Sequence, residues 1–366
     1  GIRVGAEEVV HGAYSLHTGE PLRWEVVDGT GARRMGHPRA GADRHYIMVD
    51  LPRPVPEGGE GRLRIVKTYT DANSYFADGE EIVFRRNLGI WRNAVVLPRG
   101  WELVSVNFPS QVMMEPDGRI KVSFTHAVPG GVDYEVRARP LPARAVAGLP
   151  SGPAADGPGG SASAGKAART TSSDGGSGDT TYAFPERAFA DREIVYFLQP
   201  PETHAFRLYH DYTETRPGVG RYLPVVRPGS RATDPSATLL DTGEALPVET
   251  LRGPEIAAAG IAIGGASPET EVVLIRFPAV EEGRSARLRI WETYTDPGRY
   301  FLDGETLVWD RTFGRARNRV VLPEGWWLTD SAVPALVEWT EDGRVALELN
   351  NDRDDQIRVY LRARRR

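Results

Sequence analysis

The sequence predicts an all-β protein made of two homologous antiparallel β-sandwich domains of immunoglobulin-like architecture, joined by a flexible linker. Three observations favour this fold class: runs of alternating apolar and polar residues, turn signals between these runs, and an internal repeat. The length of 366 residues is sufficient for two domains of ordinary size.

Alternating apolar and polar residues are typical of strands that are buried on one face. The alternation runs through residues 62–69 and again through residues 344–349. Asp-Gly pairs, which favour tight turns, begin at residues 78, 117, 303 and 342. Many short strands separated by such turns indicate an antiparallel sandwich, and we expect helix only as a turn or two within residues 253–259.

An internal repeat relates the two halves of the chain. The segment 62–65 recurs as residues 287–290, and the match continues without a gap to residues 137–139 and 362–364. Over this stretch 33 of 78 aligned positions are identical, which exceeds what shared composition gives. We therefore predict one domain in residues 1–147 and a second copy of it in residues 182–366.

The segment 148–181 separates the two predicted domains. It is rich in Gly, Ser, Ala and Thr and has almost no large apolar side chains. Such a segment cannot bury enough apolar surface to offset the entropy cost of ordering it. We predict a flexible linker here.

The second repeat has a segment, residues 190–226, with no counterpart in the first repeat, since the chain starts at Gly1. We expect the first domain to lack its leading strand or two. Either the chain is truncated or a neighbouring segment fills the gap, and the absence of an initial Met favours truncation. A removed leader would agree with a secreted, periplasmic or cell-surface location, which we predict.

Charge and composition exclude several classes of function. The formal net charge is -5, with both signs interspersed, which disfavours binding to nucleic acid. The absence of Cys excludes disulfides and thiolate metal sites. No apolar run approaches the length of a transmembrane helix, so no membrane span is expected.

Motifs that would indicate an enzyme are missing from the sequence. The seven His residues show no metal-ligand spacing, and His204 and His210 lie too far apart on one strand to share a metal. No nucleophile elbow and no phosphate-binding loop is present. We therefore expect no catalytic residues, no metal and no cofactor.

One set of polar residues occurs in both repeats, with Trp beside it. Its members are Asp71, Arg86, Arg92, Asn93 and Trp101 in the first repeat and Asp296, Arg311, Arg317, Asn318 and Trp326 in the second. Paired carboxylates could serve glycoside cleavage, but Asp and Arg beside turns more often hold loops in place. We interpret this set as structural, with Trp101 and Trp326 in the core.

Other aromatic residues are candidates for an exposed binding surface. They are Trp91, Trp309, Trp327 and Trp339, which have no Trp in the other repeat, together with Tyr209 and Tyr212 on one strand. Flat exposed rings can stack on sugars or anchor a protein partner. The leading hypothesis is a non-enzymatic module that binds a protein partner or scaffolds an assembly as an extrinsic subunit. The alternatives are a carbohydrate-binding module and, third, a glycan-active hydrolase.

Overall fold

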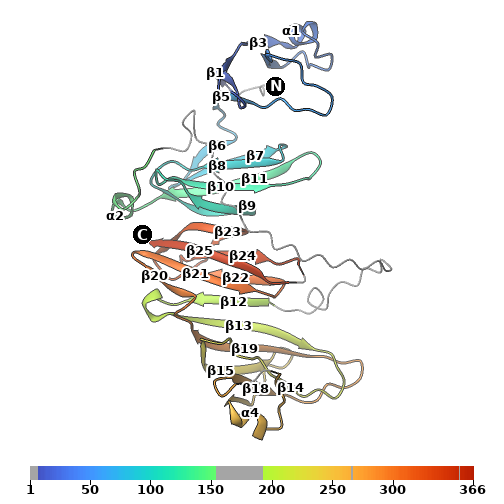
Figure 1. Ribbon diagram of the computed structural model, residues 1–366, viewed down its shortest axis with the longest axis vertical. Coiled ribbons are helices and arrows are strands. Elements are labelled where there is room, and N and C mark those ends of the chain that lie inside the picture. Colours follow the sequence, from blue (N-terminus) through green and yellow to red (C-terminus); the bar gives the residue numbers. More distant parts are fainter. Residues whose placement is uncertain (1–6, 154–192, 265–266, 354) are drawn as a thin grey trace. The chain divides into compact units, whose positions relative to one another are not determined.

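The computed structural model describes residues 7–153, 193–264, 267–353 and 355–366 (Figure 1). The chain forms two compact units, residues 1–86 with 153–167, and residues 87–152 with 168–366. The boundary at residue 86 falls inside the segment 1–147 that the repeat assigns to one domain. Most of the predicted linker 148–181 lies outside the described residues.

The prediction of an all-β protein is confirmed, because strands make up most of the ordered structure. The helices are short: α1 (Gly29–Arg34), α2 (Ala143–Ala147), α4 (Pro254–Ala258) and the 3-10 turn η1 (Pro201–Thr203). The expected turn of helix within residues 253–259 is α4. In the described part of the chain, no helix has the length and apolar character needed to cross a membrane.

The first unit contains one three-stranded sheet and two further pairs of strands. β1 (Glu7–Ser15) pairs antiparallel with β2 (Pro21–Leu22) and β5 (Leu63–Thr70). β3 (Trp24–Asp28) pairs with β4 (His45–Val49), and β6 (Tyr75–Asp78) pairs with the start of β7 (Glu81–Leu88).

The second unit begins with a four-stranded antiparallel sheet in the order β8, β10, β9, β11 (Figure 1). The bounds of these strands are β8 (Arg92–Val96), β9 (Trp101–Met114), β10 (Ile120–Thr125) and β11 (Val132–Pro140). Their inner faces are apolar and buried, as at Val122 and Val136. Strand β8, at the edge of this sheet, belongs to the candidate site described below.

The rest of the second unit is a longer sheet in the order β15, β19, β13, β12, β22, β24, β23, β25, β21, β20, with β16 beside β15. The strands are β12 (Glu193–Leu198), β13 (Ala205–Glu214), β15 (Arg231–Leu239), β16 (Ala245–Leu246), β19 (Ala286–Thr295), β20 (Tyr300–Asp303), β21 (Thr306–Phe313), β22 (Arg317–Val321), β23 (Trp326–Trp339), β24 (Val345–Asn350) and β25 (Ile357–Arg365). A separate small sheet has the order β14 (Arg221–Tyr222), β18 (Glu271–Arg276), β17 (Val248–Arg252).

Six consecutive strands of the first half, β6 to β11, have counterparts in β20 to β25. The bounds of each pair differ by the same number of residues as the repeated sequence segments do. Their pairing registers correspond as well. Lys121 faces Val96 where Ala346 faces Val321, and the β9 and β23 ladders are each interrupted by an irregularity at the same place. The repeated sequence therefore encodes the same strand lengths and registers twice.

β9 and β23 meet in an antiparallel crossing within the second unit. Val106 faces Val337, and Val112 faces Ser331, so each strand uses corresponding positions. The pair Ser110 and Ala335 at the centre is fully buried. The contact therefore has the reciprocal pattern of a two-fold interface, formed here inside one chain.

The core of the later half is an aromatic cluster under β12 and β21. Trp309 lies with its ring edge-on to Tyr196 and Phe206, at centroid distances of 5.3 and 4.9 Å. Tyr196 stacks on Phe313 at 5.1 Å. Strands β12 and β13 supply Tyr196 and Phe206, so these two strands complete the core here.

Candidate functional site

The repeated polar residues hold turns and strand ends. Arg311 donates to the Oδ2 atom of Asp296 at 2.5 Å, and both side chains are buried. In the first half, Asp71 accepts hydrogen bonds from Ser74 Oγ and the Asn73 backbone N–H, and the Ser74 hydroxyl is the main reason that its pKa is lowered. Arg86 stacks on the ring of Tyr69 at 4.4 Å. These contacts favour a structural role.

The other members of the set also lie at structural positions. Asn93 and Asn318 each donate to a backbone carbonyl in the loop before their strand. Trp326 is buried, whereas Trp101 is half-buried. Arg92 and Arg317 are exposed at the first residues of β8 and β22.

Two of the expected aromatic platforms are in the core. Trp309 and Trp327 expose 0% and 1% of their surface, so the expectation of exposed rings is wrong at these positions. β21 and β23 are covered on both faces at these positions, since 307–309 and 326–329 are each buried without alternation. Tyr212 is also buried, stacked on Tyr222 at 3.9 Å with its hydroxyl donating to Glu214.

Two further candidates are half-buried, and arginine covers their rings. The guanidinium groups of Arg139 and Arg366 lie 3.5 and 4.6 Å from the ring centroid of Trp339. Arg289 lies 4.2 Å from the ring centroid of Tyr209. These rings therefore present a guanidinium, not a flat apolar face.

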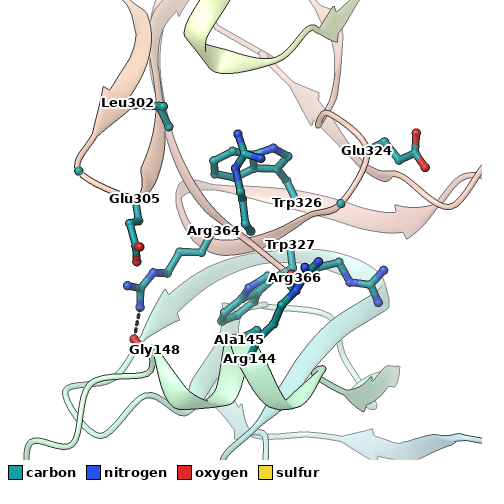
Figure 2. Close-up of a pocket in the computed structure, with 13 residues that line it drawn as sticks. Arg144, Ala145, Gly148, Leu302, Glu305, Glu324, Trp326, Trp327, Arg364 and Arg366 are labelled. Atoms are coloured by element: carbon teal, nitrogen blue, oxygen red, sulfur yellow. Dashed lines mark hydrogen bonds between the residues drawn. The ribbon is translucent and has the colours of Figure 1, made fainter.

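A cavity of about 590 Å³ lies between α2, the turn after β20 and the end of β25 (Figure 2). Its lining carries four arginines, but each is engaged. Arg364 donates to the Gly148 carbonyl at 2.8 Å, and Arg144 donates to the Arg366 carbonyl at 2.6 Å. Arg365 pairs with Glu202, and Arg366 pairs with the buried Glu102. The arginines that line the cavity therefore join α2 to β25, and each of them is already paired with a carboxylate or bonded to a carbonyl.

Buried titratable groups occur on the inner face of the later sheet. Burial raises the pKa of Glu292 to about 7, against the attraction of Arg315. Burial also lowers the pKa of His210. A perturbed pKa can mark an active site, but neither residue lines the cavity between α2 and β25. In the described ranges, no cluster of three or more His, Asp or Glu residues could hold a metal ion.

The loop before β8 presents the most exposed apolar pair in the second unit. Ile90 and Trp91 expose 73% and 69% of their surface. The backbone beneath them is fixed: Asn93 Nδ2 donates to the Ile90 carbonyl at 2.5 Å, and the His126 N–H donates to the Trp91 carbonyl at 3.0 Å. The bonded backbone thus presents two large apolar side chains to solvent next to each other, as protein-binding surfaces do.

β8 itself offers a free strand edge next to this pair. Among the described residues β8 pairs only with β10, whereas its counterpart β22 pairs with β24 on one side and β12 on the other. We take the residues 90–96, with the side chains of Ile90 and Trp91 and the open side of β8, as the candidate site and call it the β8 edge. Unpaired backbone groups on such an edge can bind another strand.

Sequence reasoning identified Trp91 but missed Ile90 and the strand edge. A signal was available in the alignment of the repeats. Ile90 and Trp91 stand where the second repeat has Arg315 and Ala316, so the first repeat places two large apolar residues where the second has a cation and a small residue.

Comparisons with known proteins identify no family for this chain. No family model matches this sequence, and no curated protein matches it. Among solved structures, a mutant M1 zinc metallopeptidase from Deinococcus radiodurans with a bound Tyr-Ser-Ala substrate is 13% identical, with a TM-score of 0.29. An aminopeptidase N family protein from Idiomarina loihiensis is 11% identical, with a TM-score of 0.27.

These likenesses are partial on both sides. The match covers 47% of this chain in each case, with 41% of the Deinococcus chain and 29% of the Idiomarina chain. The chain therefore spans less than half the length of the structures that it resembles. At these identities and TM-scores, the resemblance carries no conclusion about activity.

Proposed function

We propose that this chain is a non-enzymatic protein-binding module of a secreted or envelope assembly, and that it recruits its partner at the β8 edge. The observation that carries the proposal is that β8, within the described part of the chain, pairs on one side only and lies beside the exposed Ile90 and Trp91. Main-chain groups of an open strand supply affinity, and flanking apolar side chains supply specificity. The chain would then act as an extrinsic or scaffolding subunit.

The duplication belongs to this proposal. Corresponding strand bounds and registers support two copies of one immunoglobulin-like sandwich, in residues 1–147 and 182–366. In the second copy the edge of β22 is occupied by β12. Among the described residues no strand occupies the corresponding edge of β8, and this edge is where we propose that a partner binds.

The two alternatives have less support. Carbohydrate modules commonly use several open aromatic faces, and Trp91 is exposed here. Of the other candidate rings, Trp339 and Tyr209 are covered by arginines and Trp309 is in the core. A hydrolase would need paired carboxylates in a cleft, whereas Asp296 is bonded to Arg311 and Asp71 caps a turn.

A photo-crosslinking experiment tests the proposal. A benzophenone amino acid at the exposed position Ala94 on β8 should capture one protein from native envelope, identified by mass spectrometry. The same probe at exposed Ala332 on β23 is the matched control. The captured protein, once purified, should bind the wild-type chain and bind the Trp91→Ala variant at least about tenfold more weakly.

Two outcomes would overturn the proposal. One is equal capture at Ala94 and Ala332, and the other is unchanged affinity of the purified partner for the Trp91→Ala variant. Loss of polysaccharide binding in that variant, without any captured protein, would instead establish the carbohydrate alternative.

A further inference from the structure

In the second half, β12 pairs with the edge of β22 that corresponds to the open edge of β8. β12 runs parallel to β22, with Glu193 opposite Arg317, Val195 opposite Arg319 and Phe197 opposite Val321. On its other side β12 pairs antiparallel with β13, and η1 joins the two. The occupant is therefore a β-hairpin whose first strand lies parallel to the edge.

The residues of β22, whose edge is paired with β12, are more deeply buried than the corresponding residues of β8, whose edge is open. Val320 of β22 is fully buried, whereas the corresponding Val95 of β8 is half-buried. Asn318 exposes 4% of its surface, whereas Asn93 is half-buried. The apolar side chains of β8 are thus ready to be covered, and covering them would add hydrophobic stabilisation.

The core contact that β12 makes also has a first-half counterpart. Tyr196 of β12 faces Val320 and stacks on Phe313. Leu88, at the position that corresponds to Phe313, is half-buried. An aromatic residue opposite Val95 would cover Leu88 in the same manner.

β8 lacks the features that usually prevent strand addition. Its residues, Arg92–Val96, include no Pro and no Lys, and only the first residue is charged. Natural edge strands are commonly blocked by such residues or by a bulge. An unblocked edge in a regular ladder with β10 is suited to accept a strand.

We propose, on the basis of the proposed function, that the partner of the β8 edge is a β-hairpin of the β12–β13 type, whose first strand adds parallel to β8. The register follows from β12 on β22: an acidic residue opposite Arg92, an aliphatic residue opposite Asn93 and an aromatic residue opposite Val95. In the second half Val195, which lies opposite Arg319, packs in one buried cluster with Val321 and Ala346. Lys121 stands where the second half has Ala346, so the residue opposite Ala94 is expected to be small or acidic.

Disulfide trapping tests both register and direction, because the chain contains no cysteine. The full chain with Ala94→Cys is mixed with a synthetic peptide of residues 193–214 that carries Val195→Cys or, as matched control, Tyr196→Cys. Cross-strand neighbours have Cβ atoms about 5 Å apart, so the Val195→Cys peptide should form the mixed disulfide at least about tenfold faster.

Direction is tested with the exposed Arg92→Cys variant. The peptide with Glu193→Cys should react faster than the peptide with Phe197→Cys if the strand adds in parallel. Preference for Phe197→Cys, or equal rates for the Val195→Cys and Tyr196→Cys peptides, would overturn the inference.

The two proposals fail in different ways. A native protein captured at Ala94 together with no register preference in the peptide would leave the protein-binding function and remove the parallel hairpin. If the peptide docks in register but no native protein is captured, the inference about the hairpin at β8 stands and the proposed protein-binding function is wrong.

Discussion

Asn93 and Asn318 make the same hydrogen bond in the two halves of the chain. Asn93 Nδ2 donates to the Ile90 carbonyl at 2.5 Å, and Asn318 Nδ2 donates to the Arg315 carbonyl at 2.8 Å. Each bond closes the loop that leads into β8 or β22. The loop geometry is thus shared, while the residues that it presents, Ile90 and Arg315, differ.

Replacing these asparagines should separate stability from binding. Asn318 is buried, so Asn318→Ala should lower the free energy of unfolding by about 1–3 kcal/mol, because the Arg315 carbonyl loses its partner. The exposed bond of Asn93 should contribute less than about 1 kcal/mol. Urea denaturation of both variants measures this difference, and equal losses would show that the two loops are equally buried in solution.

The alternation of residues and the repeat were enough to predict strands and turns, because period-2 patterns and Asp-Gly turns act locally. α1 and α2 were missed because they are single turns without an extended apolar stripe. Trp309 and Trp327 were misjudged for a different reason. Which face of a strand is covered depends on neighbours far away in sequence, such as Tyr196 and Phe206 beside Trp309.

Breaking the Asp296–Arg311 pair should be strongly destabilising. Both side chains are buried, so Asp296→Asn leaves an unpaired guanidinium in the core at a cost of about 3–5 kcal/mol. Asp71→Asn in the first half should cost much less than this, since Asp71 is only partly buried. Chemical denaturation monitored by Trp fluorescence provides the measurement.

The result also bears on the hydrolase alternative. Folded Asp71→Asn and Asp296→Asn proteins that lose turnover of a glycan would contradict the structural assignment of both carboxylates. A large stability loss at Asp296 alone agrees with it.

The centre of the β9–β23 crossing should not tolerate a larger side chain. Ala335 is fully buried opposite Ser110, so Ala335→Leu should lower the free energy of unfolding by about 1–3 kcal/mol through overpacking. Ala332→Leu on the same strand is the control, because Ala332 is exposed. If the two variants are equally stable in thermal denaturation, the crossing of β9 and β23 is not formed in solution.

Stability should depend on pH through Glu292. Its pKa is raised to about 7, first by burial and further by the charge of Glu271, against Arg315. The folded state therefore holds a proton that the unfolded state has released between pH of about 4.5 and 7, so stability falls as pH rises through this window. Above this window the free energy of unfolding is lower by at most about 3 kcal/mol. Glu292→Gln should regain part of that free energy at pH 8 and should make the free energy of unfolding less dependent on pH. Urea denaturation from pH 5 to 8 measures both effects, and Glu305→Gln, at an exposed position, is the control. An unchanged slope in Glu292→Gln would mean that this carboxylate is hydrated in the folded protein.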